Sequence, residues 1–430
     1  MAKGRKVLVA TLPIPGHLFP ALSFASKLRD RGYQVVFAIE EAKAGEVERR
    51  CFQCVRTDDT FSYSPVEITM RELLLSCCGT LRKTIDNVFA DWPISQLDEL
   101  ESCVHDIQPD LIVSDCIYLA PLAVARRHGI KSAVLGVTPL ACSSPNTAPF
   151  GSGLRPTYSP HGQATYRLFA GVVRVCLRHP IRRVIKKWDS LGNRYAATQR
   201  ALRSGWLFDW PLTLSDVYLQ CSTPRLEHLR DNMSKKVHFI GPSMPVDCDP
   251  FLDSSREVSD AQKTVFITWG TMQAGVPSVF MGVMEALLKW GNVNVVAAVG
   301  RSDHCRYVPR GVSIVHGIDN FYAQLAGSDV LVTNGGFGGV KGALYFGVPV
   351  VCFGTQDDKR EVCRRVAAAR AGSSLAGKLG GVGVRDVLAE VRRVLDDGQF
   401  SSSACAVAEE LRQYERSDRA VRHIDALLSA

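Results

Sequence analysis

The sequence of 430 residues contains no long hydrophobic run. No stretch approaches the ~18 uncharged apolar residues of a membrane-spanning helix, so no transmembrane segment is expected. The apolar run near the N-terminus breaks at Pro13 and Pro15, and no small-residue cleavage pattern follows it, so no signal peptide is expected either. The 14 cysteines lack the spacing of a disulfide framework. Reduced, mostly buried cysteines in a cytoplasmic protein are the simpler interpretation.

Charge of one sign is not concentrated enough to indicate a nucleic-acid-binding protein. The net charge is +8, and the surplus is spread over short pairs such as Arg126–Arg127, Arg182–Arg183 and Arg364–Arg365. Such pairs are typical of solvated helix faces, so no nucleic-acid partner is expected. The basic run RHPIRRVIKKW at 178–188 leaves open a weak peripheral membrane contact, although a solvated helix face is the commoner origin of such a run.

Strand and helix signals alternate along the first part of the chain. Helix patterns occupy 18–33 and 119–129. Apolar runs that predict buried strands occupy 6–11, 34–40, 109–115, 131–137, 216–222 and 235–242. The segment 141–210, rich in Pro, Ser and Gly and then basic and aromatic, is expected to form helices and loops above the sheet. This alternation predicts a parallel, doubly wound sheet.

A second alternating pattern follows a polar, proline-bearing stretch at 243–262, which is the best candidate for a domain linker. Strands are expected at 264–271, 292–300, 329–336 and 349–354, and the chain after Lys359 is expected to be largely helical. We therefore predict an α/β protein with two doubly wound Rossmann-like domains, 1–242 and 263–410, facing a central cleft. A C-terminal helix over 411–430 can cross back to the first domain.

Two polar side chains stand where the first sheet is expected to end. His17 lies in PIPGHLFPA, at the start of the first helix, where an imidazole titrates near neutral pH. Asp115 ends the run PDLIVSD and should reach the same edge. A carboxylate beside an imidazole fixes its tautomer and stabilises its charged form. A capping histidine and a helix-capping aspartate are the plainer alternatives, but the pair outweighs either residue alone. Pro20 is expected in the first helical turn.

A glycine-rich loop, TNGGFGGVKG at 333–342, directly follows the apolar run DVLV. Its density of glycine indicates a close backbone approach to a phosphate, which Thr271 in TWGTM could also contact. The Walker pattern is absent, and Gly336, Gly338 and Gly342 match the dinucleotide fingerprint poorly. The acids Asp357 and Asp358 come past the tip of the next strand, which favours a contact with something beyond the nucleotide.

These pieces resemble the inverting UDP-glycosyltransferases of the GT-B class over nearly the whole chain, most strongly at 264–370. The motif TNGGFGGVKGALYFGVPVVCFGTQDDKREV is similar to the bacterial and fungal branch that glycosylates lipids, polyketides and sterol-like compounds. The resemblance implies metal- and cofactor-free transfer of a sugar to a hydroxyl of an apolar small molecule or lipid, with UDP-glucose as the first choice of donor. It assigns the acceptor to domain 1–242 and the nucleotide sugar to domain 263–410, in a monomer or homodimer.

The resemblance also implies residue roles, with His17 as the base that deprotonates the acceptor and Asp115 as the residue that orients it. The donor-binding positions are Gly16, Thr271, His316, Gly317, Ile318, Asn334, Gly336, Phe337, Gly338, Gly339, Asp358 and Lys359. Thr271, Asn334 and 336–339 fall at the diphosphate, 316–318 at the nucleobase, and Asp358 with Lys359 at the sugar hydroxyls. Three positions depart from the family: His316 replaces a tryptophan, Gly342 a ribose-binding glutamate and Lys359 a glutamine. TDP-linked sugars therefore remain open.

Three other functions fit parts of the sequence. A metal-dependent glycosyltransferase could use Asp247-Cys248-Asp249, but this D-x-D lies in the linker and not after a strand. An NAD-type oxidoreductase could use the glycine loop, but it would leave His17 and Asp115 without a role. A non-catalytic glycosyltransferase-like partner protein would keep the fold, but it has no need of that pair. Residues 60–90 and 141–210 are expected to line the acceptor pocket, from family position and apolar content.

Overall fold

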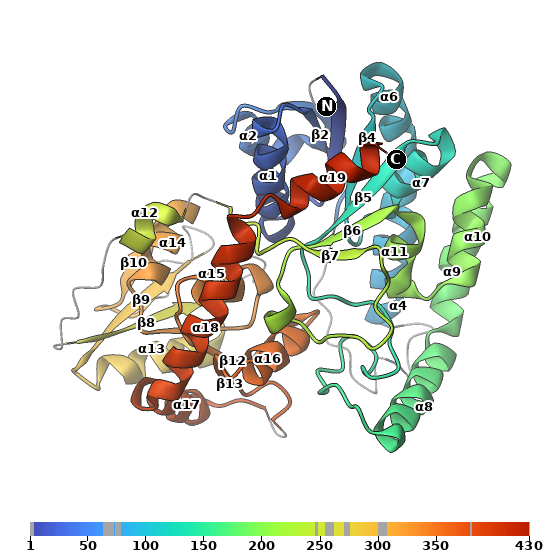
Figure 1. Cartoon of the computed structure of the whole chain (residues 1–430). Coiled ribbons are helices and arrows are strands. Elements are labelled where there is room, and N and C mark those ends of the chain that lie inside the picture. Colours follow the sequence, from blue (N-terminus) through green and yellow to red (C-terminus); the bar gives the residue numbers. More distant parts are fainter. Residues whose placement is uncertain are drawn as a thin grey trace.

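The computed structural model describes residues 4–62, 73, 79–245, 248–253, 262–270, 276–299, 308–378 and 381–429. It contains a sheet of seven strands and a sheet of six strands, and every strand pair in both is parallel. Helices pack around both sheets, and the two α/β units lie side by side (Figure 1). The predicted GT-B architecture of two doubly wound domains is confirmed.

The first sheet has the order β3-β2-β1-β4-β5-β6-β7. Its strands are β1 Lys6–Ala10, β2 Gln34–Glu40, β3 Gln53–Thr57, β4 Leu111–Asp115, β5 Lys131–Gly136, β6 Val217–Gln220 and β7 Val237–Phe239. The helices of this unit are α1 Pro15–Asp30, α2 Glu41–Glu48, α4 Thr80–Asp86, η1 Asn87–Asp91, α5 Trp92–Ser95, α6 Leu97–Ile107, α7 Leu119–His128, α8 Pro160–Cys176, α9 Arg178–Asp189, η2 Gly192–Tyr195, α10 Ala196–Ser204, η3 Leu207–Asp209, α11 Trp210–Leu214 and η4 Pro224–Leu226.

The second sheet has the order β10-β9-β8-β11-β12-β13. Its strands are β8 Lys263–Thr268, β9 Val293–Ala298, β10 Ser313–Val315, β11 Val330–Thr333, β12 Val350–Cys352 and β13 Gly372–Ser374. The helices are α12 Asp249–Asp253, α13 Ser278–Leu288, α14 Ile318–Ala326, α15 Phe337–Tyr345, α16 Lys359–Ala368, α17 Val384–Asp396, α18 Gly398–Glu415 and α19 Arg419–Ser429. Among the described residues no helix is both long enough and apolar enough to span a membrane.

Each sheet reverses its strand order once, and these two reversals position the site. The reversal lies between β1 and β4 in the first sheet and between β8 and β11 in the second. Loops leave the sheet in opposite directions there, which opens a crevice at the carboxyl ends of the strands. Asp115 is the last residue of β4, Asn334 directly follows β11, and His17 lies in the first turn of α1, which follows β1.

Three short edge strands, β3, β10 and β13, were not expected from the sequence. Their sequences are QCVRT, SIV and GSS, which are too short or too polar to form the apolar run that marks a buried strand. Backbone pairing with a neighbour holds them: Gly372 to Ser374, for example, pair with Val350 to Cys352. The chain after Lys359 is largely helical, as expected, and the short strand β13 is the exception among its described residues.

The C-terminal segment crosses the molecule as two helices, not as one. Helix α18 runs beside α15, and α19 lies over α1 in the first unit (Figure 1). Ala420, Val421 and Ile424 are buried in the core of that unit. At the crossing, Lys27 Nζ lies 2.7 Å from Glu415 Oε1. The single helix expected over 411–430 is therefore interrupted between Glu415 and Arg419.

Candidate active site

A cleft of about 1250 Å³ lies between the two sheets and takes its walls from both units. It is larger than most single-ligand pockets, which suits a site for two substrates. Most of the site residues expected from the sequence line it, namely Gly16, His17, Gly317, Ile318, Asn334, Gly336, Phe337, Gly338, Gly339, Asp358 and Lys359. Asp115 lies directly behind His17, and His316 stands beside the lining residue Gly317. Thr271 and Asp247 lie outside the described residues.

His17 and Asp115 form a direct pair at the strand-order reversal of the first sheet. His17 Nδ1 lies 2.7 Å from Asp115 Oδ2, and their side chains are 12% and 1% exposed. The other carboxylate oxygen, Oδ1, accepts a hydrogen bond from the Ile117 backbone N–H at 3.0 Å. Asp115 does not cap the helix that follows, because α7 has no side-chain cap. The carboxylate accepts the Nδ1 proton, so Nε2 is the nitrogen with a lone pair.

The surroundings of His17 raise the pKa of its imidazole above the ordinary value of 6.5. Burial acts in the opposite direction, but the negative charge of Asp115 and its hydrogen bond outweigh that effect. The charge of Asp358, from the second unit, also raises this pKa. The imidazole is therefore coupled to carboxylates on both sides of the cleft.

Helix α1 begins earlier than the sequence suggested. Its first residue is Pro15, because a proline ring presets the backbone angle of a first helical position. Pro20 therefore lies inside the helix and not in its first turn. Since proline has no N–H, the carbonyl of Gly16 receives no helical hydrogen bond from Pro20. The carbonyl oxygen of Gly16, next to His17 in the chain, therefore lacks its usual helical hydrogen bond.

The glycine-rich loop forms the turn from β11 into α15. Gly335 has φ +91°, a backbone conformation that favours glycine, and Gly336 is the N-cap residue of α15. The side-chain amide of Asn334 donates a hydrogen bond to the Trp269 carbonyl, which fastens this turn to the end of β8. The first amides of α15 lack helical partners and carry the positive end of the helix dipole. This helix start lines the cleft and is suited to an anionic group.

Asp358 and Lys359 stand at the beginning of α16, on the cleft. Burial raises the pKa of Asp358, while the nearby Lys359 and His17 act to lower it. Lys359 Nζ lies 3.0 Å from a carboxylate oxygen of Asp357, so its charge is already partly neutralised. Asp358 lies close enough to His17 for the charge of each residue to affect the pKa of the other.

Gly342 lies on the inner side of α15, against α14. A Cβ atom added there would come within 2.6 Å of Tyr322 Cε1 and 3.1 Å of Leu325 Cδ1. A glutamate at 342 would therefore need Tyr322 to move. The aromatic ring occupies the direction in which a side chain at this position would leave the helix.

Lys341 is a cleft residue that the sequence did not reveal. Its side chain is buried at 2% exposure, and its ammonium donates to the carbonyls of Cys221 at 2.7 Å and Pro242 at 3.1 Å. Burial lowers the pKa of this amine, and its charge acts to lower the pKa of His17. The lysine thus ties the donor-side helix α15 to backbone that follows β6 and β7.

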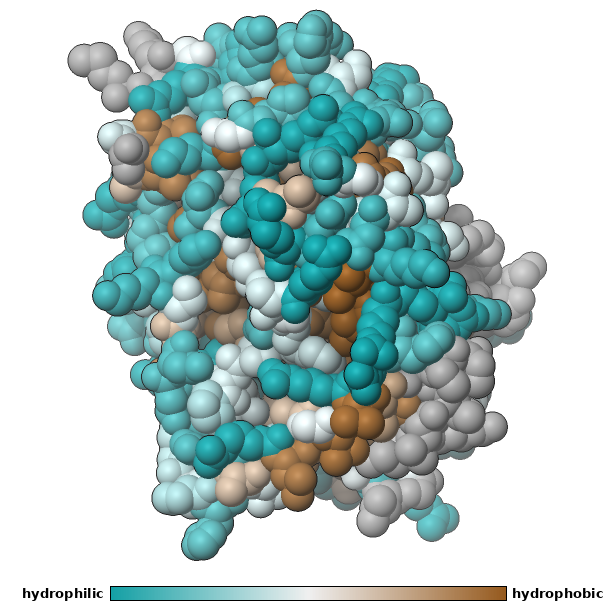
Figure 2. Space-filling view, turned by 90° about the vertical axis from the view of Figure 1, so that its right-hand side faces the viewer, coloured by the Kyte–Doolittle hydropathy of each residue, from teal (hydrophilic) through white to brown (hydrophobic). Residues whose placement is uncertain are grey.

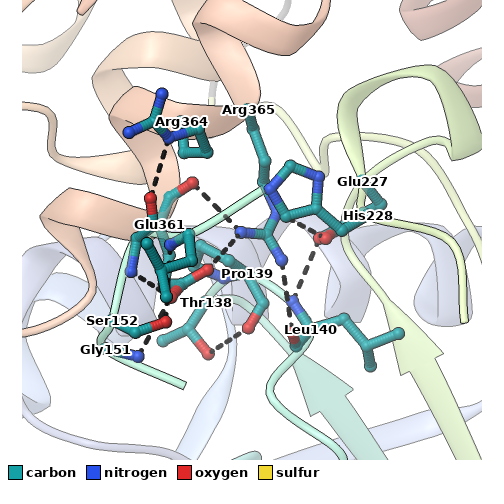
Figure 3. Close-up of polar contacts among 12 residues, drawn as sticks. Thr138, Pro139, Leu140, Gly151, Ser152, Glu227, His228, Glu361, Arg364 and Arg365 are labelled. Atoms are coloured by element: carbon teal, nitrogen blue, oxygen red, sulfur yellow. Dashed lines mark hydrogen bonds and ion pairs between the residues drawn. The ribbon is translucent and has the colours of Figure 1, made fainter. Parts of the chain in front are cut away.

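A buried ionic network joins the two units (Figure 3). Arg365 of α16 lies 2.7 Å from Glu227 of the first unit and 3.0 Å from Glu361. Glu361 Oε1 in turn accepts the backbone N–H groups of Gly151 and Gly153 at 3.0 and 2.9 Å. The pair Arg364–Arg365 was interpreted as part of a solvated helix face, and for Arg365 this is wrong, because its side chain is 1% exposed.

Gly153 shows how closely the two units approach at this network. Its φ is +62°, and an added Cβ would come within 2.9 Å of Arg360 Cβ. Its carbonyl accepts a hydrogen bond from Arg364 Nε at 2.8 Å. The loop 149–154, most of which lines the cleft, is therefore held by the first turns of α16.

Removing the arginine of this network should destabilise the protein strongly. In Arg365→Ala, Glu227 and Glu361 would remain buried without a counter-charge, and the expected loss is about 3–5 kcal/mol of unfolding free energy. Thermal and urea unfolding measure it. Arg203→Ala, which breaks an exposed pair with Asp189, is the control and should cost no more than about 1 kcal/mol. Equal effects of the two variants would contradict the inferred burial of the charges.

The first unit lines the cleft that His17 borders with many apolar side chains. Residues 61–89 contribute Phe61, Leu73, Leu81, Ile85, Val88 and Phe89. Residues 141–211 contribute Ala141, Phe150, Phe169, Val173, Leu177, Trp206, Leu207, Phe208 and Pro211. Both segments expected to line an acceptor pocket are thus on the cleft. A hydroxyl on an apolar molecule could approach Nε2 of His17 from this side.

Two facing Rossmann-like units, with an anion-suited helix start opposite a histidine–aspartate pair, define a nucleotide-sugar-dependent glycosyltransferase of the GT-B class. Comparison with known proteins agrees. The 4'-demethylrebeccamycin synthase of Lentzea aerocolonigenes is 30% identical over 436 residues, which cover 99% of this chain and 99% of that protein. UDP-glucosyltransferase A1 of Starmerella bombicola is 25% identical over 439 residues, which cover 95% of this chain and 89% of that protein. No protein-family model matches the chain.

Solved structures show the same fold. The kitacinnamycin glycotransferase superposes with a TM-score of 0.72 at 18% identity, over 99% of this chain and 100% of that one. The spinosyn rhamnosyltransferase SpnG complexed with thymidine diphosphate superposes with a TM-score of 0.66 at 15% identity, over 98% and 100%. The chain belongs to the UDP-glycosyltransferases of GT-B fold. It transfers a sugar from a nucleotide sugar to a small-molecule acceptor.

Proposed function

We propose that this glycosyltransferase moves glucose from UDP-glucose to a hydroxyl of an apolar small molecule or lipid, with inversion and without a metal ion or other cofactor. The observation that carries the mechanism is the 2.7 Å contact between His17 Nδ1 and Asp115 Oδ2 at the wall of the shared cleft. A base oriented in this way, opposite a helix start that suits a diphosphate, supports direct displacement at the anomeric carbon.

In this reaction the acceptor oxygen attacks the anomeric carbon from the face opposite the diphosphate. As the new bond forms, the hydroxyl proton passes to Nε2 of His17, and Asp115 stabilises the imidazolium through Nδ1. The bond to the diphosphate oxygen breaks, and the negative charge that develops there is stabilised by the amides at the start of α15. Enclosure by apolar walls keeps water from attacking the donor.

The apolar segments at 61–89 and 141–211 support an apolar acceptor. The relatives fit this class of compound, because one is named as a synthase of 4'-demethylrebeccamycin and another structure is a spinosyn rhamnosyltransferase. For the donor, UDP-glucosyltransferase A1 supports UDP-glucose, whereas the SpnG complex contains thymidine diphosphate. Position 342 is a glycine and Tyr322 occupies the space beside it, so no carboxylate is present there to select the ribose of UDP. UDP-glucose is thus the first donor to test and a TDP-sugar the second.

Asp358→Ala is expected to raise the KM for the donor sugar about tenfold and to leave the affinity for UDP nearly unchanged. The reason is that Asp358 stands at the start of α16, beyond the glycine-rich turn proposed to hold the diphosphate. A lost hydrogen bond between a charged group and the sugar costs about 1.5–3 kcal/mol. Steady-state kinetics and calorimetry with UDP separate the two effects. A matching fall in UDP affinity would contradict this assignment.

The whole proposal is tested by a thermal-shift screen of UDP-, TDP- and GDP-sugars, followed by mass spectrometry of products from a mixed panel of apolar alcohols. Stabilisation by UDP-glucose and a mass increase of one hexose are the expected results. EDTA should leave the rate unchanged, and inhibition that added metal reverses would contradict a metal-independent reaction. Binding of a sugar donor without any product would favour a non-catalytic partner protein.

A further inference from the structure

The outer surface of α8 and its neighbourhood concentrates exposed apolar side chains. Of seven large apolar side chains that are strongly exposed among the described residues, five lie in one short segment: Leu154, Tyr158, Leu168, Val172 and Val175. Leu168, Val172 and Val175 are 72%, 43% and 74% exposed, and their spacing places them on one face of α8. Figure 2 shows apolar side chains gathered in the lower part of the face that α8, α9 and α10 form.

Helix α8 has little cover from the rest of the chain. Of its 17 residues only Val173 is buried. Phe169 and Val173, on the neighbouring face of the helix, line the cleft. The helix is therefore a thin wall between the acceptor side of the cleft and the outside. A cluster of exposed apolar side chains of this kind usually marks an interaction surface.

The same surface carries the most one-sided charge in the sequence. No aspartate or glutamate occurs between Asp115 and Asp189, and the segment 154–188 contains eight lysines and arginines. Arg183 and Lys187 pair with carboxylates of the neighbouring segment 86–91. The others, Arg155, Arg167, Arg174, Arg178, Arg182 and Lys186, are exposed and form no ion pair within the described part of the chain. Arg174 lies over the ring of Trp206.

We propose that the α8–α9 surface docks on an anionic lipid bilayer. Leu168, Val172 and Val175 enter the boundary between headgroups and acyl chains, and the basic side chains around them contact lipid phosphates. Charge selects this occupant: Asp86, Asp91 and Asp231 lie near these helices, but the six exposed basic side chains without an ion pair leave the surface cationic, and a second copy of the chain would bring two cationic surfaces together. The inference goes beyond the proposed function and does not depend on it. Its consequence is that helix α8, which lines the acceptor side of the cleft, would lie against the lipid bilayer, in which apolar alcohols dissolve.

Co-sedimentation of the full-length protein with vesicles tests the proposal without any sugar transfer. At low salt we expect binding to phosphatidylcholine vesicles that contain phosphatidylglycerol, no binding to phosphatidylcholine alone, and release as salt rises. Leu168→Glu/Val175→Glu should reduce binding at least about tenfold, and Arg182→Glu/Lys186→Glu at least about fivefold per charge removed. Ile314→Glu, which changes an exposed apolar residue on the edge strand β10 of the second unit, is the control and should bind as the parent does.

The melting temperature of each variant must match the parent, so that lost binding cannot come from lost structure. No binding to phosphatidylglycerol vesicles at low salt would overturn the proposal. Binding that survives both double substitutions would overturn it as well, because other residues would then make the contact. A concentration-dependent dimer in solution that Leu168→Glu/Val175→Glu dissociates would assign the surface to a second copy of the chain instead.

Discussion

His17→Ala is expected to lower kcat for sugar transfer about 10²–10⁴-fold, while the affinity for UDP stays within about twofold of the parent. The loss follows from removing the group that accepts the hydroxyl proton in the transition state. The retained affinity follows from position, because His17 stands on α1 in the first unit and the helix start suited to the diphosphate belongs to α15 in the second. Product formation by mass spectrometry and UDP binding by calorimetry measure the two quantities.

The matched control is His105→Ala, because this side chain is 89% exposed on α6 and contributes nothing to the cleft. That variant should transfer sugar at the parental rate. If His17→Ala retained parental turnover, the general-base assignment would be wrong, whatever the acceptor is. If it lost UDP affinity in proportion to kcat, His17 would be a donor-binding residue.

Asp115→Asn should have the second largest effect, a fall in kcat of roughly 10²-fold or more. The new amide would point an N–H at Nδ1 of His17, where the carboxylate accepts at 2.7 Å in the parent. The imidazole would then carry its proton on Nε2, the nitrogen that must accept one. Because asparagine keeps an oxygen for the Ile117 N–H, the fold should be little changed.

The pH profile distinguishes this effect from simple damage. In the parent, transfer should increase with pH through the raised pKa of His17, above 6.5, because only the neutral imidazole is a base. Without the negative charge of Asp115 that pKa falls, so the rising limb of the Asp115→Asn profile should move to lower pH. In a His17→Ala background, Asp115→Asn should cost little more. An unshifted limb, or fully additive losses, would contradict the pairing.

The sequence predicted those parts of the site that local signals determine. His17, Asp115 and the glycine-rich turn each stand at or just after the end of an apolar strand, and the strand order then brings these strand ends to one cleft. Strand ends are recognisable because buried parallel strands are almost continuously apolar. The two-domain architecture follows from the same alternation, and the missed strands β3, β10 and β13 are those in which pairing replaces apolar burial.

The parts that were missed depend on contacts between distant residues. Lys341 and Arg365 each look like an exposed basic residue on a helix, yet both are buried, because carbonyls or a carboxylate far away in the chain accept hydrogen bonds from them. Glu227 is separated from Arg365 by 138 positions. No periodicity records such a pairing. The only local signal of burial is a single charged residue in an otherwise uncharged, largely apolar helical stretch, as with Lys341 in GGVKGALYF.

The Arg365 network has a consequence for recombining this enzyme with its relatives. Glycosyltransferases of two domains invite exchange of whole halves, one for a new acceptor and one for a new donor. Here the Arg365 guanidinium is paired with Glu227 of the N-terminal half and Glu361 of the C-terminal half. Glu361 also accepts hydrogen bonds from the backbone of the N-terminal loop 151–153. A foreign C-terminal half without an arginine at this place would leave Glu227 buried and unpaired. A chimaeric enzyme should therefore keep Glu227, Glu361 and Arg365 together, although they come from different halves.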